Sequence, residues 1–191
     1  DIAINNKGLR DLPKPRMFLS KEELLMGRQI VNQVKEKLKK EKVIIIQPFG
    51  RGINHVDNTF VDSTGRSIEF KDLKELIRKL QENDFAVITM AEMGFDFTKD
   101  KFKDDVAMPE SVQLRHWSAA IKFANHFIGC DSVGQHLSYI MDTPSTIILG
   151  PTYPINVSYP DCEFFNIVDL GQHGRVYDPI RIMPDETTSR H

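Results

Sequence analysis

The sequence of 191 residues is poor in the features that most readily restrict a protein's function. It has only two cysteines, Cys130 and Cys162, and no Cys and His spacing typical of a zinc site. So few thiols argue against a disulfide framework and favour a reducing compartment. The net charge of −2 provides no general electrostatic reason to bind nucleic acid or an anionic membrane. No apolar run approaches the roughly 20 residues that a membrane span requires. With no signal-peptide pattern either, we expect a cytoplasmic globular protein.

Other absences concern metals and domain organisation. The sequence contains no internal repeat and no Asp-x-Asp pair at the end of a predicted strand, and Asp104-Asp105 falls in a charged loop. We therefore expect neither a metal ion nor a cofactor. The chain begins at Asp1 rather than Met, which indicates processing, trimming or a piece of something larger.

Predicted helices and strands alternate along most of the chain. A capping box at Ser20-Lys-Glu-Glu23 starts the first helix. Helical and strand-like hydrophobic patterns then predict helices at about 20–42, 70–80, 112–125 and 133–141, and strands at 43–47, 85–90, 126–130, 146–149 and 164–168. This order predicts an α/β, Rossmann-like three-layer domain, with a mainly parallel sheet and helices on both faces.

We expect three parts in the chain. Residues 1–18 are expected to be a linker or arm, 19–171 the Rossmann-like domain, and 172–191 a tail that wraps the domain or frays. Residues 58–68 contain a turn-rich stretch, Asp62 to Arg66, that is either a small hairpin or an extended loop.

Four short segments lie at the carboxyl ends of predicted strands. They are Gly50-Arg51, Ala91-Glu92, Asp131-Ser132 and Gly150-Pro151. Because the carboxyl ends of parallel strands lie along one edge of the sheet, and ligands of such sheets bind there, these segments predict a nucleotide or phosphate site.

The segment around Asp131 allows a structural and a functional interpretation. Asp131 and Ser132 are good helix caps, and that role needs no ligand. Gly134, however, lies in the first helical turn, where glycine costs about 1 kcal/mol relative to alanine unless some group must approach the backbone. His136 is near the same helix start, where it is either a structural histidine or a donor to a phosphate or sugar hydroxyl.

The same segment resembles a known family. The motifs Cys130-Asp-Ser-Val-Gly-Gln-His-Leu137, Asp142-Thr-Pro144 and Ile147-Ile-Leu-Gly-Pro-Thr152 are similar to those of the ADP-heptose:lipopolysaccharide heptosyltransferases, glycosyltransferase family nine. The likeness covers about residues 15–155, and residues 131–152 are its diagnostic part.

The resemblance implies a two-domain GT-B enzyme, of which this chain looks like the C-terminal, donor-binding domain. By that resemblance Asp131 contacts the donor sugar, and Ser132 and the backbone around Val133 and Gly134 contact the diphosphate. His136 orders the site.

Further binding residues are expected at the same edge of the sheet. Arg66 stands where the family places a basic residue near the phosphates, and an exposed turn arginine is the alternative interpretation. Arg51 is a second candidate, and Glu92 is placed to bind a ribose or base unless it is a surface glutamate. Gly50 and Gly150 would let the backbone approach the ligand.

Two departures from the family pattern bear on the donor. Val133 occupies a position where the family usually has glycine, and the loop between Gly50 and Arg66 is longer. Both weaken the assignment of ADP-heptose as the donor.

The function predicted from these observations is transfer of a sugar from a nucleoside diphosphate to an acceptor hydroxyl, with inversion and without metal. The acceptor would be a glycolipid, a protein or a modified nucleic acid. By the family resemblance, the general base is expected from an N-terminal GT-B domain, or from a partner chain. The alternatives are a non-catalytic nucleotide-binding or assembly module, and a nucleotide-sugar epimerase or hydrolase.

Overall fold

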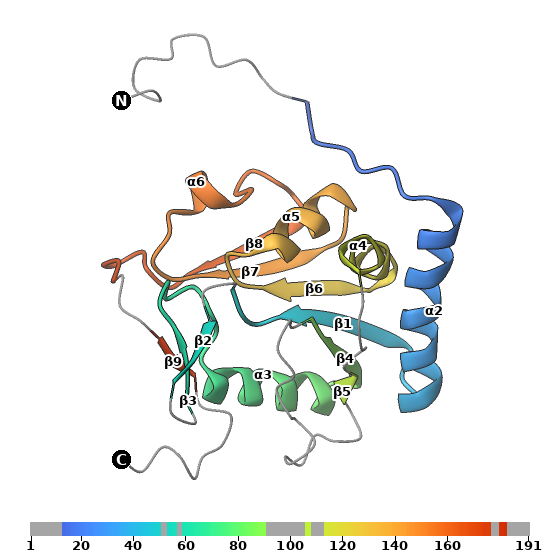
Figure 1. Ribbon diagram of the computed structural model, residues 1–191, viewed down its shortest axis with the longest axis horizontal. Coiled ribbons are helices and arrows are strands. Elements are labelled where there is room, and N and C mark those ends of the chain that lie inside the picture. The colour runs from blue at the N-terminus through green and yellow to red at the C-terminus, as the bar shows by residue number, and fades with distance from the viewer. Residues whose placement is uncertain are drawn as a thin grey trace.

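The central element of the structure is a six-stranded sheet with the order β5-β4-β1-β6-β7-β8, in which every neighbouring pair is parallel (Figure 1). This computed structural model describes residues 13–50, 53–56, 59–90, 106–107, 113–176 and 180–182. The strands are β1 Lys42–Gln47, β4 Phe85–Thr89, β5 Val106–Ala107, β6 His126–Gly129, β7 Ser145–Leu149 and β8 Phe165–Asp169. The predicted α/β class with a parallel sheet is confirmed.

Helices cover both faces of this sheet, as the hydrophobic patterns predicted (Figure 1). The helices α2 (Lys21–Leu38), α4 (Leu114–Phe123) and α5 (Val133–Ile140) contribute to one core, and α3 (Phe70–Glu82) contributes to the other. In β1, Val43 and Ile45 enter the first core, and Ile44 and Ile46 enter the second. Both faces of this strand are therefore buried, which explains its uninterrupted apolar sequence.

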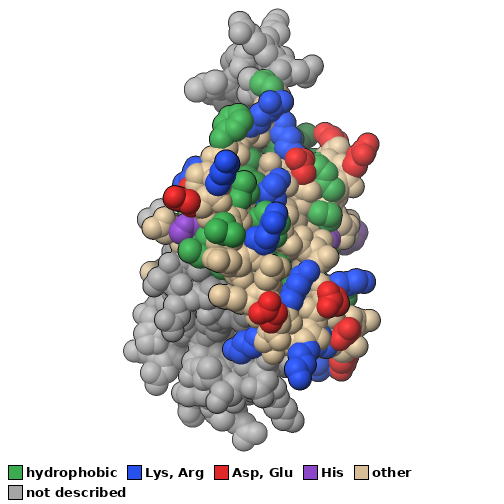
Figure 2. Space-filling view, turned by 90° about the vertical axis from the view of Figure 1, so that its right-hand side faces the viewer, with side chains coloured by type: hydrophobic (Ala, Val, Ile, Leu, Met, Phe, Trp, Pro, Cys, Tyr) green, Lys and Arg blue, Asp and Glu red, His purple; other side chains and the backbone are tan. Residues whose placement is uncertain are grey.

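Helix α2 begins as predicted, with a reciprocal capping box between Ser20 and Glu23. It ends at Leu38, a few residues before the predicted end, because Lys39 adopts a left-handed backbone conformation. The lysines that follow are solvated or paired: Lys40 forms an ion pair with Asp84. Figure 2 shows the face that carries α2, where Lys and Arg side chains are interspersed with acidic and apolar ones rather than gathered into one basic patch.

A second, three-stranded antiparallel sheet lies beside the carboxyl edge of the first (Figure 1). It consists of β2 Ile53–Val56, β3 Thr59–Asp62 and β9 Ile180–Ile182. The hairpin is thus formed by β2 and β3, and the turn from Asp62 to Arg66 leads onward to α3 instead of closing the hairpin. The expected tail supplies β9, a strand too short to give a sequence pattern.

The described part of the expected N-terminal arm lies against the domain. Met17 packs on the core, and Lys14 pairs with Asp142 while lying 4.6 Å from the centre of the Tyr139 ring. Short apolar and charged contacts of this kind carry no periodic signal. None of the helices in the described ranges has the length and apolar composition needed to cross a bilayer.

Candidate functional site

The predicted site segments meet at the carboxyl edge of the parallel sheet. Gly50 follows β1, Asp131 and Ser132 follow β6, and Gly150 follows β7. Strand β6 is hydrogen-bonded between β1 and β7, so Asp131 lies in the middle of this edge. Arg51 and Glu92 lie outside the described residues, and their predicted roles stay predictions.

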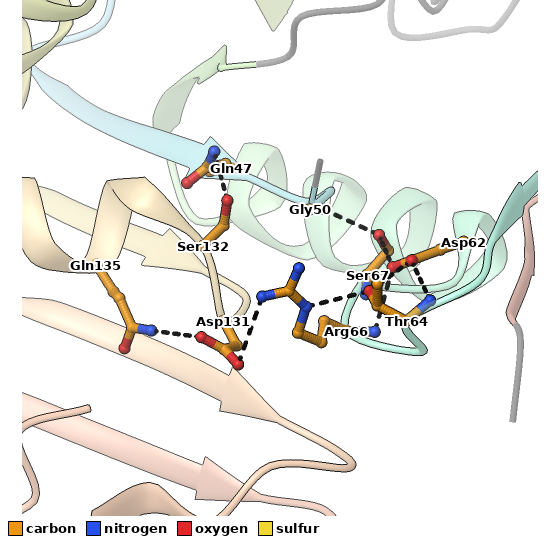
Figure 3. A network of polar contacts seen from close by, with 9 residues as sticks. All are labelled: Gln47, Gly50, Asp62, Thr64, Arg66, Ser67, Asp131, Ser132 and Gln135. Carbon is orange, nitrogen blue, oxygen red and sulfur yellow. Dashed lines mark hydrogen bonds and ion pairs between the residues drawn. The ribbon is translucent and has the colours of Figure 1, made fainter. Parts of the chain in front are cut away.

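The start of α5 is held by Gln47, at the end of β1 (Figure 3). Ser132 is the N-cap residue, but its side chain makes no capping hydrogen bond. Instead the Gln47 side chain donates from Nε2 to Ser132 Oγ (3.2 Å) and accepts at Oε1 from the Gly134 N–H (2.7 Å). The helix is therefore capped by a residue of strand β1. In the sequence Gln47 is only the end of an apolar run, so no local pattern identified it as a cap.

Gly134 has a packing explanation. A Cβ at this position would lie 2.4 Å from Gln47 Oε1 and 2.4 Å from Phe127 Cζ. The prediction that glycine permits a close approach agrees with this geometry, but the approaching groups belong to the protein. Gly134 is thus accounted for without a ligand.

Asp131 is buried and faces Arg66 (Figure 3). It accepts a hydrogen bond from Gln135 Nε2 at 3.1 Å, and its other oxygen lies 3.9 Å from Arg66 Nη1. That distance is longer than a hydrogen bond, so the pair is a loose one. The Arg66 side chain is 31% exposed, which leaves part of this cation open to solvent at the edge of the sheet.

Arg66 is oriented by a turn built around Asp62. The buried Asp62 carboxylate accepts hydrogen bonds from the backbone N–H groups of Thr64, Arg66 and Ser67 and from the hydroxyls of Thr64 and Ser67. Burial alone would raise the pKa of Asp62, but the hydrogen bonds from Ser67 and Thr64 outweigh it and lower the pKa below its usual value. The carboxylate therefore stays charged.

Two hydroxyls extend this turn to the rest of the site (Figure 3). Thr64 Oγ1 donates to Asp62 and accepts from Arg66 Nε at 3.1 Å. Ser67 Oγ donates to Asp62 and accepts from the Gly50 N–H at 3.0 Å. Asp62 thus positions both predicted residues, Arg66 and Gly50. The Asp-Ser-Thr-Gly sequence of a turn was its only signal.

His136 lies on α5 with its Nδ1 2.8 Å from the Tyr159 hydroxyl. Burial lowers the pKa of His136, and the nearby Asp131 charge only partly opposes this. Tyr159 in turn stacks on Tyr139, with ring centres 3.6 Å apart. His136 therefore favours the neutral form and is anchored in an aromatic cluster.

The loop after β7 is fixed by Arg175, from the expected tail. Its guanidinium donates to the carbonyl oxygens of Gly150 (2.9 Å) and Thr152 (2.7 Å) and to both carboxylate oxygens of Asp169. It also lies 4.2 Å from the centre of the Tyr153 ring. No sequence pattern connects Arg175 to this loop, so the sequence alone did not identify it.

The thiol chemistry and metal-binding capacity of the described residues are limited. Burial, together with the Asp131 and Asp62 charges, raises the pKa of the Cys130 thiol to about 12, so Cys130 is not a nucleophile. Within the described ranges, no three His, Cys, Asp or Glu side chains form a group that could hold a metal ion.

Comparison of the sequence with protein-family models and with curated proteins gives no match. Comparison of the structure with solved structures does. The chain is similar to the ADP-heptose LPS heptosyltransferase II of E. coli, with a TM-score of 0.62 and 15% identity over 94% of this chain and 54% of that one. It is also similar to a family 9 glycosyl transferase of Veillonella parvula, with a TM-score of 0.61 and 13% identity over 87% of this chain and 46% of that one.

A third similar structure is the E. coli heptosyltransferase WaaC with ADP-2-deoxy-2-fluoro heptose. Its TM-score is 0.51, with 14% identity over 68% of this chain and 37% of that chain. The chain thus spans about half or less of the length of these proteins. At such low identities the likeness shows the fold alone: the described domain has the Rossmann-like α/β fold that occurs in these glycosyltransferases.

Proposed function

We propose that this chain is the donor-binding domain of a glycosyltransferase that takes a sugar from a nucleoside diphosphate. The observation that carries the proposal is the arrangement of Arg66, Asp131 and Ser132 at the carboxyl edge of the sheet. It places a partly open cation, a buried carboxylate and the hydroxyl of the next residue, at a helix start, along this edge. The fold likeness to heptosyltransferases supports it.

Each of these groups suits one part of a nucleotide sugar. The planar guanidinium of Arg66 stays charged and pairs with phosphate oxygens. The α5 start contributes the Ser132 hydroxyl and a partial positive charge. Asp131 is an acceptor for hydroxyl groups of the donor sugar. The Gly134 N–H already donates to Gln47, so we assign the diphosphate to Arg66, Ser132 and the other N–H groups of this helix start.

The reaction proposed is an inverting displacement. The acceptor oxygen forms a bond to the anomeric carbon on the side opposite the diphosphate, while the bond from that carbon to the diphosphate oxygen breaks. Arg66 and the helix start stabilise the negative charge that develops on the leaving diphosphate. The acceptor's proton passes to a general base that we assign to a separate GT-B domain or a partner chain. We propose that no metal takes part.

The proposal is tested by nucleotide binding in the Arg66→Met variant. We expect the wild-type chain to be stabilised thermally by at least one of ADP, UDP and GDP or their sugar conjugates. Arg66→Met should weaken that binding by about 10- to 100-fold, as expected for the loss of a charge-assisted hydrogen bond. Titration calorimetry measures the loss, and Asp131→Ala should weaken binding of the sugar conjugate more than that of the plain diphosphate.

The matched control is Arg78→Met. Arg78 is an exposed arginine on α3 that pairs with Glu75 and Glu82, and its replacement should leave the affinity unchanged. Because no metal is proposed to take part, the wild-type chain should bind the nucleotide with the same affinity in Mg²⁺ and in EDTA. Absence of binding by every nucleotide, or equal losses in the two arginine variants, would refute the proposal. Release of nucleotide from a sugar conjugate without acceptor would favour a hydrolase instead.

A further inference from the structure

Gln47 joins two elements of the proposed site. It is buried, with 8% of its surface exposed, and its amide bridges Ser132 and Gly134 from the end of β1. We propose that Gln47 is a positioning residue that fixes the direction of the hydrogen bond at Ser132, so that the Ser132 hydroxyl donates its proton to an anionic phosphate oxygen. This inference rests on the proposed function and deepens it.

The direction follows from the chemistry of the three groups. A backbone N–H only donates, so the Gln47 atom that faces the Gly134 N–H is the amide oxygen. The other amide atom, Nε2, is then the one that faces Ser132 Oγ, and an amide NH₂ only donates. Ser132 Oγ is therefore the acceptor of this bond, and its own proton must point to another partner.

That proton is available to a ligand. Ser132 is half-buried, and among the described residues no group accepts a hydrogen bond from its Oγ. Arg66 lies 3.9 Å from the carboxylate of the neighbouring Asp131 and adds a positive charge at the same edge of the sheet. A fixed O–H donor beside a cation and a helix start interacts more strongly with a charged phosphate oxygen than with a neutral sugar oxygen.

The decisive variant is Gln47→Glu. The carboxylate keeps an acceptor for the Gly134 N–H, so the helix cap remains, but the group that faces Ser132 now accepts instead of donating. The Ser132 hydroxyl then donates to the introduced carboxylate, so its proton is no longer available to a ligand phosphate. We expect the affinity for a nucleoside diphosphate to fall by about 10- to 100-fold, with a much smaller change for the corresponding nucleoside.

A double-mutant cycle separates this effect from the added negative charge. In a Ser132→Ala background the charge is still present but no hydroxyl can be turned, so the fall caused by Gln47→Glu should be at least about tenfold smaller. The probes are ADP and adenosine, or the diphosphate and nucleoside pair that the wild-type chain binds best. Affinities are measured by calorimetry, and thermal unfolding checks that each variant is folded.

Gln47→Met is the second variant, for use if the buried carboxylate prevents folding. This change frees the Ser132 hydroxyl to rotate. When Ser132 is present, Gln47→Met should therefore lower the affinity for the diphosphate several-fold. When Ser132 is replaced by alanine, Gln47→Met should leave that affinity unchanged. Equal effects in the two backgrounds, or equal effects on diphosphate and nucleoside, would overturn this inference. Failure of the wild-type chain to bind any diphosphate would instead overturn the proposed function.

Discussion

Two half-buried histidines give the folded state a defined response to pH. Burial lowers the pKa of both His126 and His136 below the usual 6.5. His126 Nε2 lies 2.9 Å from Thr146 Oγ1, and His136 Nδ1 lies 2.8 Å from the Tyr159 hydroxyl. Below pH 6.5 the unfolded chain therefore binds more protons at these two sites than the folded chain does.

The free energy of unfolding should thus decrease as the pH falls below about 6.5, and should be nearly constant from there up to pH 8. A double variant, His126→Gln with His136→Gln, should lose most of the decrease between pH 7 and pH 5. Urea unfolding at several pH values measures it. Carboxylates such as Asp62, with a lowered pKa, respond only at lower pH and do not disturb this window. An unchanged pH dependence in the double variant would contradict the assignment.

At the residue scale, sequence reasoning identified positions better than it identified partners. It selected Asp131, Ser132 and Gly134, and the structural interpretation of the first two was that they cap a helix. The structure has that helix start but assigns the cap to Gln47. The reason is distance along the chain. Gln47 and Gly134 are 87 residues apart, and no local sequence pattern encodes such a pair.

At the scale of elements, the contact between α2 and α4 depends on Gly27. A Cβ at Gly27 would lie 2.4 Å from the backbone carbonyl carbon of Ala119 and 2.6 Å from the nitrogen of Ala120. Both are backbone atoms, which cannot move without shifting the helix. Glycine is thus tolerated inside α2, despite its low helix propensity, because it lets the two helices approach.

We expect Gly27→Ala to lower the free energy of unfolding by about 1–3 kcal/mol, the usual cost of overpacking. Propensity alone would predict a gain of about 1 kcal/mol, so the sign of the change distinguishes the two effects. Denaturant unfolding provides the measurement. The control is Asn32→Ala, at an exposed position of the same helix, which should be neutral or slightly stabilising. A stabilised Gly27→Ala variant would show that α2 and α4 are further apart.

At the scale of the whole molecule, Arg175 connects the C-terminal part of the chain to the edge of the sheet that carries the site. Its side chain is 8% exposed and binds Asp169, Gly150 and Thr152 together. The Arg175 guanidinium lowers the pKa of Asp169, which therefore remains charged. Gly171 is also close to this loop, since a Cβ there would lie 2.2 Å from the Gly150 carbonyl oxygen.

Replacing this guanidinium should loosen the loop after β7 without unfolding the sheet. In Arg175→Met we expect amide hydrogen exchange at Asn156 and Ser158, in α6 (Pro154–Val157) and just after it, to accelerate by about tenfold because local opening becomes easier. Amides of β1 and β4 should keep their exchange rates. Arg78→Met serves again as the control. Uniform acceleration throughout the chain would mean that Arg175 stabilises the whole fold rather than the loop.

The sequence by itself determined the alternation of helices and strands, the parallel sheet and the edge at which Gly50, Asp131 and Gly150 meet. These properties depend on hydrophobic periodicity and on turn residues, which are local. Only the tertiary structure decided which groups touch: Gln47 with Ser132, Arg66 with Asp131, and Arg175 with Gly150. It also added β9, whose three residues are stabilised by pairing with β3 and not by any pattern of their own. Contacts between distant segments arise from packing of the whole chain, so residue spacing alone does not specify them.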